Sequence, residues 1–308
     1  MSVHGWIVLD KPAGLGSTQG VAAVKRVLRQ GGHGKVKVGH GGTLDPLATG
    51  VLPIALGEAT KLAGRMLDAT KAYAFTIAFG TQTDTLDLEG QVIARADHLP
   101  AWAEIVAVLP RFTGPIAQVP PAYSALKVDG RRAYDLARAG EVVELATRAV
   151  TIHRLDVDPA DRPDDPAQRL ATLTLTADVS KGTYIRSLAR DIALGLGTVG
   201  HVTMLRRLRA GPFDLAQAIS LDKLDTIAKG ATLEHMILPL EAGLDDIPAL
   251  DLDPEQARAV RQGRVLTGLP LSDGLWLARS GMVPVALVDL SGGALRVARG
   301  FNLSDVAE

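Results

Sequence analysis

Two repeating patterns of apolar residues run along this chain, one with the period of a strand and one with the period of a helix. Residues 71–79 and 170–179 alternate apolar and polar side chains, which is typical of strands with one buried face. In the first of these strands, one face carries Tyr73, Phe75, Ile77 and Phe79. Residues 17–30 instead place apolar side chains three and four positions apart, and Ser17 or Thr18 can cap the helix that this spacing predicts.

The other expected elements rest on shorter signals. A polar turn over 81–90 lies between two strand-like segments and predicts a hairpin. The further strands that we expect lie at 6–9, 51–56, 91–95, 142–156 and 199–208. The further helices that we expect lie at 58–67, 101–109, 221–228 and 233–236, with another that begins at Tyr184. Helices and strands are therefore interspersed along most of the chain.

The character of the sequence changes near residue 245. From Ile247 onward, short strands and glycine turns predominate, and 256–263 is the only helix expected there. We therefore expect two domains, a large one over 1–245 and a small one over 246–308.

Composition narrows the class of protein. The chain has 308 residues, 47% of them hydrophobic, which is enough for these two domains. It has no cysteine, no signal-peptide pattern, no apolar run long enough for a membrane helix, and no histidine spacing typical of a metal site. We expect a cytoplasmic protein without a metal. The formal net charge is −1, but basic residues gather at 25–37 and 181–209, so a neutral total can hide a positive face.

A glycine-rich stretch, Gly39-His40-Gly41-Gly42-Thr43-Leu44-Asp45-Pro46, precedes the apolar run at 51–56. Glycines let the backbone approach a ligand closely, and Asp followed by Pro also suits an ordinary type I turn. The spacing from Gly34 to Gly39 resembles the start of a phosphate-binding P-loop. His40-Gly41 stands where that motif needs Lys and Ser or Thr, so a nucleotide cofactor is disfavoured.

Residues 118–140 combine two early prolines with aromatic and basic side chains. Aromatic rings can stack on bases and guanidinium groups can pair with phosphates, which suits single-stranded RNA. An exposed loop and helix of ordinary charge is the alternative. Because this segment has no full apolar face, we expect a mobile thumb that becomes ordered when RNA binds.

Four blocks in order, at 39–57, 71–90, 118–140 and 180–213, resemble the tRNA pseudouridine-55 synthases, the TruB family. The block around Asp45 is similar to the family's signature, and Gln-Val-Pro-Pro-Ala-Tyr-Ser-Ala-Leu-Lys is similar to its RNA-gripping thumb. The resemblance implies an α+β pseudouridine synthase fold, in which helices and loops flank a mixed, largely antiparallel sheet. A small β-rich, PUA-like RNA-binding domain is expected to follow.

The same resemblance implies an isomerase that converts uridine 55 in the T loop of tRNA to pseudouridine. The glycosidic bond breaks, the base rotates, and a carbon–carbon bond forms, with no cofactor. The expected partner is the T stem-loop of tRNA, and we expect a monomer. By resemblance, Asp45 is the catalytic carboxylate and Arg186 pairs with it. Whether Asp45 attacks C6, attacks C1′ or acts as a base stays open.

The remaining site residues follow from the resemblance and from the basic clusters. The substrate-binding residues that the resemblance implies, besides Arg186, are His40, Tyr73, Tyr184 and Leu205. The residues expected to bind the RNA backbone are Lys127, Arg131, Arg132, Arg206 and Arg207.

The chain departs from the family pattern at two places. Gly41 stands where the family usually has threonine, and the segment at 31–37 is longer than usual. Two other functions remain open, namely a non-catalytic RNA-binding or tRNA-folding protein and an enzyme of free nucleosides or glycosides. The intact Asp45, Tyr73 and Arg186 argue against the first, and the basic thumb argues against the second.

Overall fold

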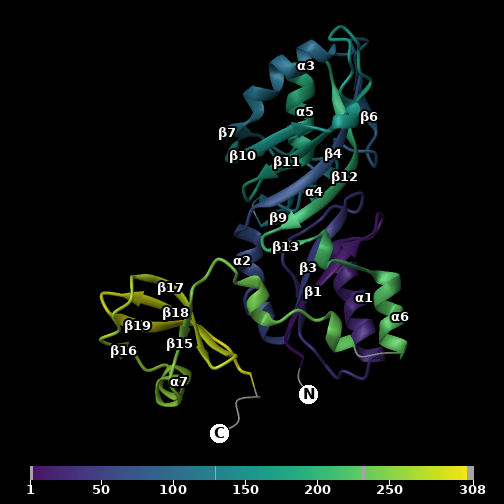
Figure 1. Cartoon of the computed structure of the whole chain (residues 1–308). Coiled ribbons are helices and arrows are strands. Elements are labelled where there is room, and N and C mark those ends of the chain that lie inside the picture. The colour runs from purple at the N-terminus through teal and green to yellow at the C-terminus, as the bar shows by residue number, and fades with distance from the viewer. Residues whose placement is uncertain (1–2, 129, 231–232, 304–308) are drawn as a thin grey trace.

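A ten-stranded mixed sheet organises the larger part of the computed structural model, which describes residues 3–128, 130–230 and 233–303 (Figure 1). Its main path runs in the order β14-β1-β3-β12-β4-β11-β10-β7, with β2 paired to β3 and β13 to β12. Its strands are β1 (Gly5–Lys11), β2 (Val38–His40), β3 (Thr49–Leu56), β4 (Lys71–Phe79), β7 (Gly114–Gln118), β10 (Arg148–Val157), β11 (Thr172–Val179), β12 (Gly200–Ala210), β13 (Phe213–Asp214) and β14 (Ile219–Ser220). Only the β1–β14 and β3–β12 pairs are parallel, so the predicted mixed, largely antiparallel sheet is confirmed.

A smaller five-stranded sheet follows, in the order β15-β17-β18-β19-β16 (Figure 1). Its strands are β15 (Ala249–Asp251), β16 (Leu266–Thr267), β17 (Gly274–Ser280), β18 (Val283–Ser291) and β19 (Ala294–Gly300). Two short hairpins are formed by β5 (Thr81–Thr83) with β6 (Val92–Arg95) and by β8 (Lys127–Val128) with β9 (Arg131–Arg132). The expected β-rich C-terminal domain is therefore present. The hairpin expected between residues 71–79 and 91–95 was wrong in its partner, because β6 pairs with β5, which lies inside the expected turn, while β4 pairs with β11 and β12.

Helices cover both sheets. The α-helices are α1 (Ser17–Gln30), α2 (Ala63–Asp68), α3 (Trp102–Val108), α4 (Ala133–Arg138), α5 (Ile185–Gly195), α6 (Leu221–Gly230) and α7 (Pro254–Arg261). The 3-10 helices are η1 (Gly57–Lys61), η2 (Leu109–Phe112), η3 (Pro159–Asp161), η4 (Leu215–Gln217), η5 (Leu233–Met236) and η6 (Leu240–Gly243). Within residues 3–128, 130–230 and 233–303, no helix is both long and apolar enough to cross a membrane.

The main core lies on one face of the large sheet, where α1 and α5 pack. Phe75, Ile77 and Phe79 are buried there and Tyr73 packs against the same cluster, so the predicted alternation of β4 is confirmed. On the opposite face of β1 and β3, a second cluster joins Trp6 and Met66 to apolar side chains of β17, β18 and the chain end. The small domain is therefore packed against the large one.

The largest errors in the sequence-based boundaries concern one strand and one helix. The strand expected to start at Val142 starts at Arg148, because only residues 148–152 have β7 as a partner. Val142 is 92% exposed, so its apolar side chain marks no buried strand. The helix expected over 58–67 is split into η1 and α2 around Leu62.

Candidate active site

Asp45 lies in the loop that connects β2 to β3. The Ala48 N–H donates to the Asp45 carbonyl at 3.1 Å, so the turn suggested by Asp-Pro is present. Ser17, the first residue of α1, holds Leu44 from both sides. Its Oγ accepts from the Leu44 N–H at 2.8 Å and donates to the Leu44 carbonyl at 3.0 Å. The residue before Asp45 is therefore fixed to the first residue of α1.

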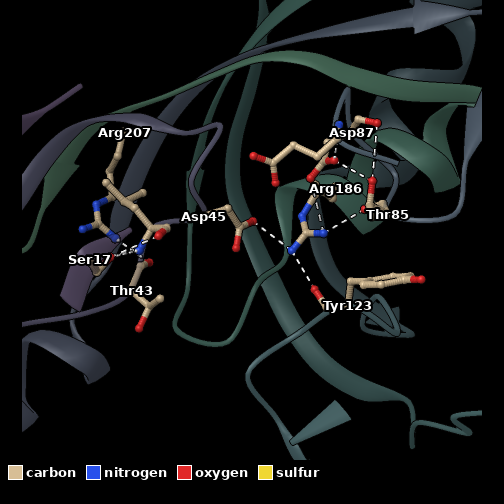
Figure 2. Close-up of polar contacts among 10 residues, drawn as sticks. Ser17, Thr43, Asp45, Thr85, Asp87, Tyr123, Arg186 and Arg207 are labelled. Atoms are coloured by element: carbon tan, nitrogen blue, oxygen red, sulfur yellow. Dashed lines mark hydrogen bonds and ion pairs between the residues drawn. The ribbon is translucent and has the colours of Figure 1, made fainter. Parts of the chain in front are cut away.

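The guanidinium of Arg186, in the first turn of α5, joins three loops (Figure 2). Its Nη2 lies 2.9 Å from Asp45 Oδ2, and its Nη1 lies 3.5 Å from Asp87 Oδ2. It also donates to the carbonyls of Thr85 at 2.8 Å and Tyr123 at 2.9 Å. The Arg186 side chain is 6% exposed and that of Asp45 is 37% exposed. Solvent can therefore reach the carboxylate while its cation stays buried, where the pair is less screened than at the surface.

The start of α5 is itself held by the base of the 118–140 segment. Gln118 is buried at the end of β7, and its side-chain amide pairs with the backbone of Tyr184. The Tyr184 N–H donates to Gln118 Oε1 at 2.8 Å, and Gln118 Nε2 donates to the Tyr184 carbonyl at 3.1 Å. Burial raises the pKa of the Tyr184 phenol, so the hydroxyl stays protonated at neutral pH.

A buried lysine supports the Asp45 loop from β1. Lys11 is fully buried, and its Nζ donates to the carbonyls of Pro12 at 2.9 Å, Leu15 at 2.6 Å and Pro46 at 3.2 Å. Burial lowers the pKa of Lys11 to about 8, although the nearby Asp45 charge opposes part of that shift. The ammonium form uses one N–H on Pro46 and the other two on Pro12 and Leu15, and so ties the turn after Asp45 to the segment between β1 and α1.

The other predicted substrate residues lie on β2, β4 and β12. His40 ends β2, with its Nδ1 2.7 Å from the Gly42 carbonyl. Tyr73 lies half-buried on β4, and Leu205 lies buried on the neighbouring strand β12, both in the main core. The structure thus places His40 in the segment that leads into the Asp45 loop, and Tyr73 and Leu205 on the two central strands.

The 118–140 segment is a folded unit with a small buried face. The β8–β9 hairpin leads into α4, where Ala133 and Leu136 are buried, and its ordering on RNA binding stays a prediction. Arg132 lies 5.7 Å from the centre of the Tyr134 ring, and Arg131 pairs with Glu141 at 3.0 Å. Lys127 and both arginines are exposed, as expected for residues that bind phosphates.

The two arginines predicted to bind RNA from β12 differ in position. Arg206 is partly exposed and pairs with Asp10 at 2.9 Å. Arg207 is 1% exposed, and its guanidinium donates to the carbonyls of Val51 and Thr43. The phosphate-binding role predicted for Arg207 therefore does not fit its position, since its guanidinium is buried and points toward Thr43 at the start of the Asp45 loop (Figure 2).

Sequence reasoning missed four residues that shape this site: Lys11, Ser17, Asp87 and Gln118. The sequence signals were weak: Lys11 lies in Asp-Lys-Pro after a strand, Ser17 at a possible helix cap, Asp87 in a polar turn, and Gln118 shortly before two prolines. Such signals are common in unrelated proteins. In the described part of the chain, no group of three or more His, Asp or Glu side chains could hold a metal ion.

Comparison with known proteins gives consistent matches along the chain. Residues 25–185 match the N-terminal domain of the TruB family pseudouridylate synthases, and residues 186–245 match the tRNA pseudouridylate synthase B C-terminal domain. The chain is 72% identical to tRNA pseudouridine synthase B of Novosphingobium aromaticivorans, covering 99% of this chain and 100% of that protein. It is 57% identical to tRNA pseudouridine synthase B of Zymomonas mobilis, covering 98% and 97%.

Solved structures give the same picture of the fold. A chain from an H/ACA RNP bound to a substrate RNA containing 2'-deoxyuridine has a TM-score of 0.72 at 26% identity, covering 98% of this chain and 86% of that one. A Cbf5-Nop10-Gar1 complex contains a chain with a TM-score of 0.71 at 27% identity, covering 97% and 85%.

Proposed function

Since the chain belongs to the TruB family of pseudouridylate synthases and isomerises uridine in tRNA to pseudouridine, we propose that Asp45 carries this reaction and that the target is uridine 55 of the T loop. The observation that carries the proposal is the contact between Asp45 Oδ2 and Arg186 Nη2 at 2.9 Å. A buried guanidinium beside a half-exposed carboxylate stabilises its negative charge and fixes its direction, both of which a nucleophile or base requires.

The reaction rearranges two bonds of one nucleoside. The N1–C1′ bond breaks, the uracil rotates while it stays bound, and C5 bonds to C1′. The C5 proton leaves and N1 gains a proton, so no atom other than hydrogen is exchanged. In the proposal, Asp45 supplies the carboxylate at C6, at C1′ or at the proton that is lost, and each of these roles needs the ionised form.

The uridine must leave its stack to reach Asp45. We assign Tyr73 to stacking on the extruded base, and Tyr184 and Leu205 to the pocket around it. Tyr73 and Leu205 lie on adjacent strands, and Tyr184 is the N-cap of α5, two residues before Arg186. His40 helps to displace the base, because it ends the strand that leads into the Asp45 loop.

Phosphate binding is assigned to the thumb and to one arginine of β12. The exposed Lys127, Arg131 and Arg132 lie on one hairpin, and Arg206 remains a candidate because its side chain is partly exposed. The C-terminal domain is proposed to be PUA-like and to bind RNA. The enzyme is proposed to act as a monomer in the cytoplasm, where tRNA is modified.

Site-specific product analysis tests the target. The protein is incubated with a T stem-loop RNA that carries tritium at C5 of uridine 55, because C5 loses its proton when the new bond forms. We expect tritium release and one pseudouridine at that position. A matched RNA with tritium only at a stem uridine is the control. Release from the stem label, or pseudouridine elsewhere in tRNA and none at position 55, would contradict the assignment.

A further inference from the structure

One buried arginine connects the two ends of the Asp45 loop. Arg207 Nε donates to the Val51 carbonyl at 2.7 Å, and Arg207 Nη1 donates to the Thr43 carbonyl at 3.3 Å. Thr43 precedes Asp45 by two residues, and Val51 is the third residue of β3 beyond the loop. A single planar group therefore sets the spacing between the strand that leaves the loop and the chain that enters it.

The Arg207 backbone lies directly against Gly50, and its guanidinium lies near Gly42. A Cβ atom at Gly50 would lie 2.2 Å from the Arg207 carbonyl oxygen, and Gly50 has a φ of +98°. A Cβ atom at Gly42 would lie 3.6 Å from Arg207 Nη1, at a φ of +122°. These two glycines let the loop close around the Arg207 backbone on one side and its guanidinium on the other.

The charge of Arg207 is poorly compensated. Among the described residues it forms no ion pair, and its buried Nη2 has no hydrogen-bond partner. Its charge also lowers the pKa of Lys11 and of Lys71, each of which is shifted mainly by burial. A buried cation without a counter-ion is unfavourable for folding, and such exceptions call for a functional explanation.

We propose that Arg207 is a positioning residue that holds the Asp45 loop at the spacing catalysis needs, and this proposal rests on the proposed role of Asp45. Arg207 pairs in register with Tyr73 across β12 and β4, so the same residue also relates the loop to the strand that carries the stacking tyrosine. Lysine is no substitute here, because Arg207 presents two separate nitrogens of one rigid plane, Nε and Nη1, to the two carbonyls, and lysine has a single ammonium on a flexible stem.

The test compares Arg207→Lys and Arg207→Gln with Arg209→Lys. Arg209 lies on the same strand and pairs with Asp178 at 2.8 Å, away from the loop, so it controls for the same change of side chain. We would measure the single-turnover rate on saturating T stem-loop RNA, the affinity for that RNA, and the unfolding midpoint. All rates are taken well below the midpoint of each variant.

We expect both Arg207 variants to lose at least tenfold in rate, with RNA affinity within twofold of wild type, and Arg209→Lys to keep the wild-type rate. A rate within twofold of wild type for Arg207→Lys would overturn the proposal. So would a loss of affinity at unchanged rate, which would make Arg207 an RNA contact. If Arg207→Lys does not fold, Arg207→Gln decides by the same criteria.

The proposed function can fail separately. If Asp45→Asn keeps its activity while Arg207→Lys loses it, Asp45 is not the catalytic group although Arg207 still supports the site. If Asp45→Asn is inactive and Arg207→Lys is fully active, only the positioning role fails.

Discussion

Gly41 stands where the family usually has threonine, and the structure gives a reason that can be tested. A Cβ atom on Gly41 would lie 2.7 Å from Met66 Cβ and 2.8 Å from Met66 Cγ. Carbon atoms in contact ordinarily lie about 3.5–4.0 Å apart. Met66 is buried on α2 in the cluster that joins the two domains, so it cannot turn away into solvent. Any side chain at position 41 must therefore move α2 or the Asp45 loop.

The expected loss of stability in Gly41 variants follows from the cost of overpacking a buried site. Forcing one methyl group into a filled site costs about 1–3 kcal/mol, and alanine recovers about 0.4–1 kcal/mol by restricting the unfolded chain. We expect Gly41→Ala to lower the free energy of unfolding by about 1–2 kcal/mol and Gly41→Thr to lower it further. Restoring the threonine usual in the family should therefore harm this chain. The rate should also fall, because Gly41 lies next to His40.

Gly39 provides a matched control. A Cβ atom there would meet nothing within 4 Å, and its φ is not in the left-handed region. Gly39→Ala should be neutral or slightly stabilising. Urea unfolding of the three variants, compared at equal m values, measures the differences. If Gly41→Ala is as stable as Gly39→Ala to within about 0.5 kcal/mol, the proposed contact with Met66 does not constrain the loop.

Three further predictions concern the rest of the site. The rate on saturating tRNA should fall as pH rises through about 8, because neutral Lys11 cannot donate to three carbonyls, and a rate that stays flat to about pH 9.5 would contradict this. The same titration of Lys11 should raise the free energy of unfolding between pH 8 and 10.5, because the unfolded chain binds more protons than the folded one in this range. Replacing residues 126–139 with a Gly–Ser linker should weaken tRNA binding but leave the rate on saturating tRNA within about threefold of wild type, because the contacts of Gln118 and Tyr123 remain. A much larger loss of that rate would mean that the thumb shapes the active site itself. Arg206→Ala should reduce the slope of log affinity for tRNA against log salt concentration by the amount expected for about one phosphate contact. An unchanged slope would mean that Arg206 is a structural partner of Asp10 and does not bind RNA.

Much of the fold could be predicted from periodicity. The alternation in β4 and β11 and the helical spacing in α1 identified buried faces, because each of these elements packs on one side only. Val142 shows the limit of predicting strand boundaries from apolar residues. An apolar residue beside a strand looks the same in the sequence whether or not a partner strand reaches it, and β7 pairs only from Arg148 onward.

The site was predictable where resemblance named the residue, and much less so where burial decided the role. The contact of Arg186 with Asp45 agrees with the expectation. Arg206 and Arg207 looked equivalent in the sequence, yet Arg206 is partly exposed and Arg207 is buried against the Asp45 loop. Charge normally indicates the surface, so neither the buried Arg207 nor the buried Lys11 could be placed without the tertiary structure.

The most direct test of the central claim is the single-turnover rate of Asp45→Asn on saturating T stem-loop RNA, with RNA affinity measured on the same preparation. Asparagine keeps the shape of the side chain and removes the negative charge that Arg186 stabilises. If Asp45 carries the chemistry, pseudouridine formation should disappear while RNA affinity stays within a few fold of wild type. Activity within tenfold of wild type, equivalent to no more than about 1.4 kcal/mol of barrier, would contradict the assignment.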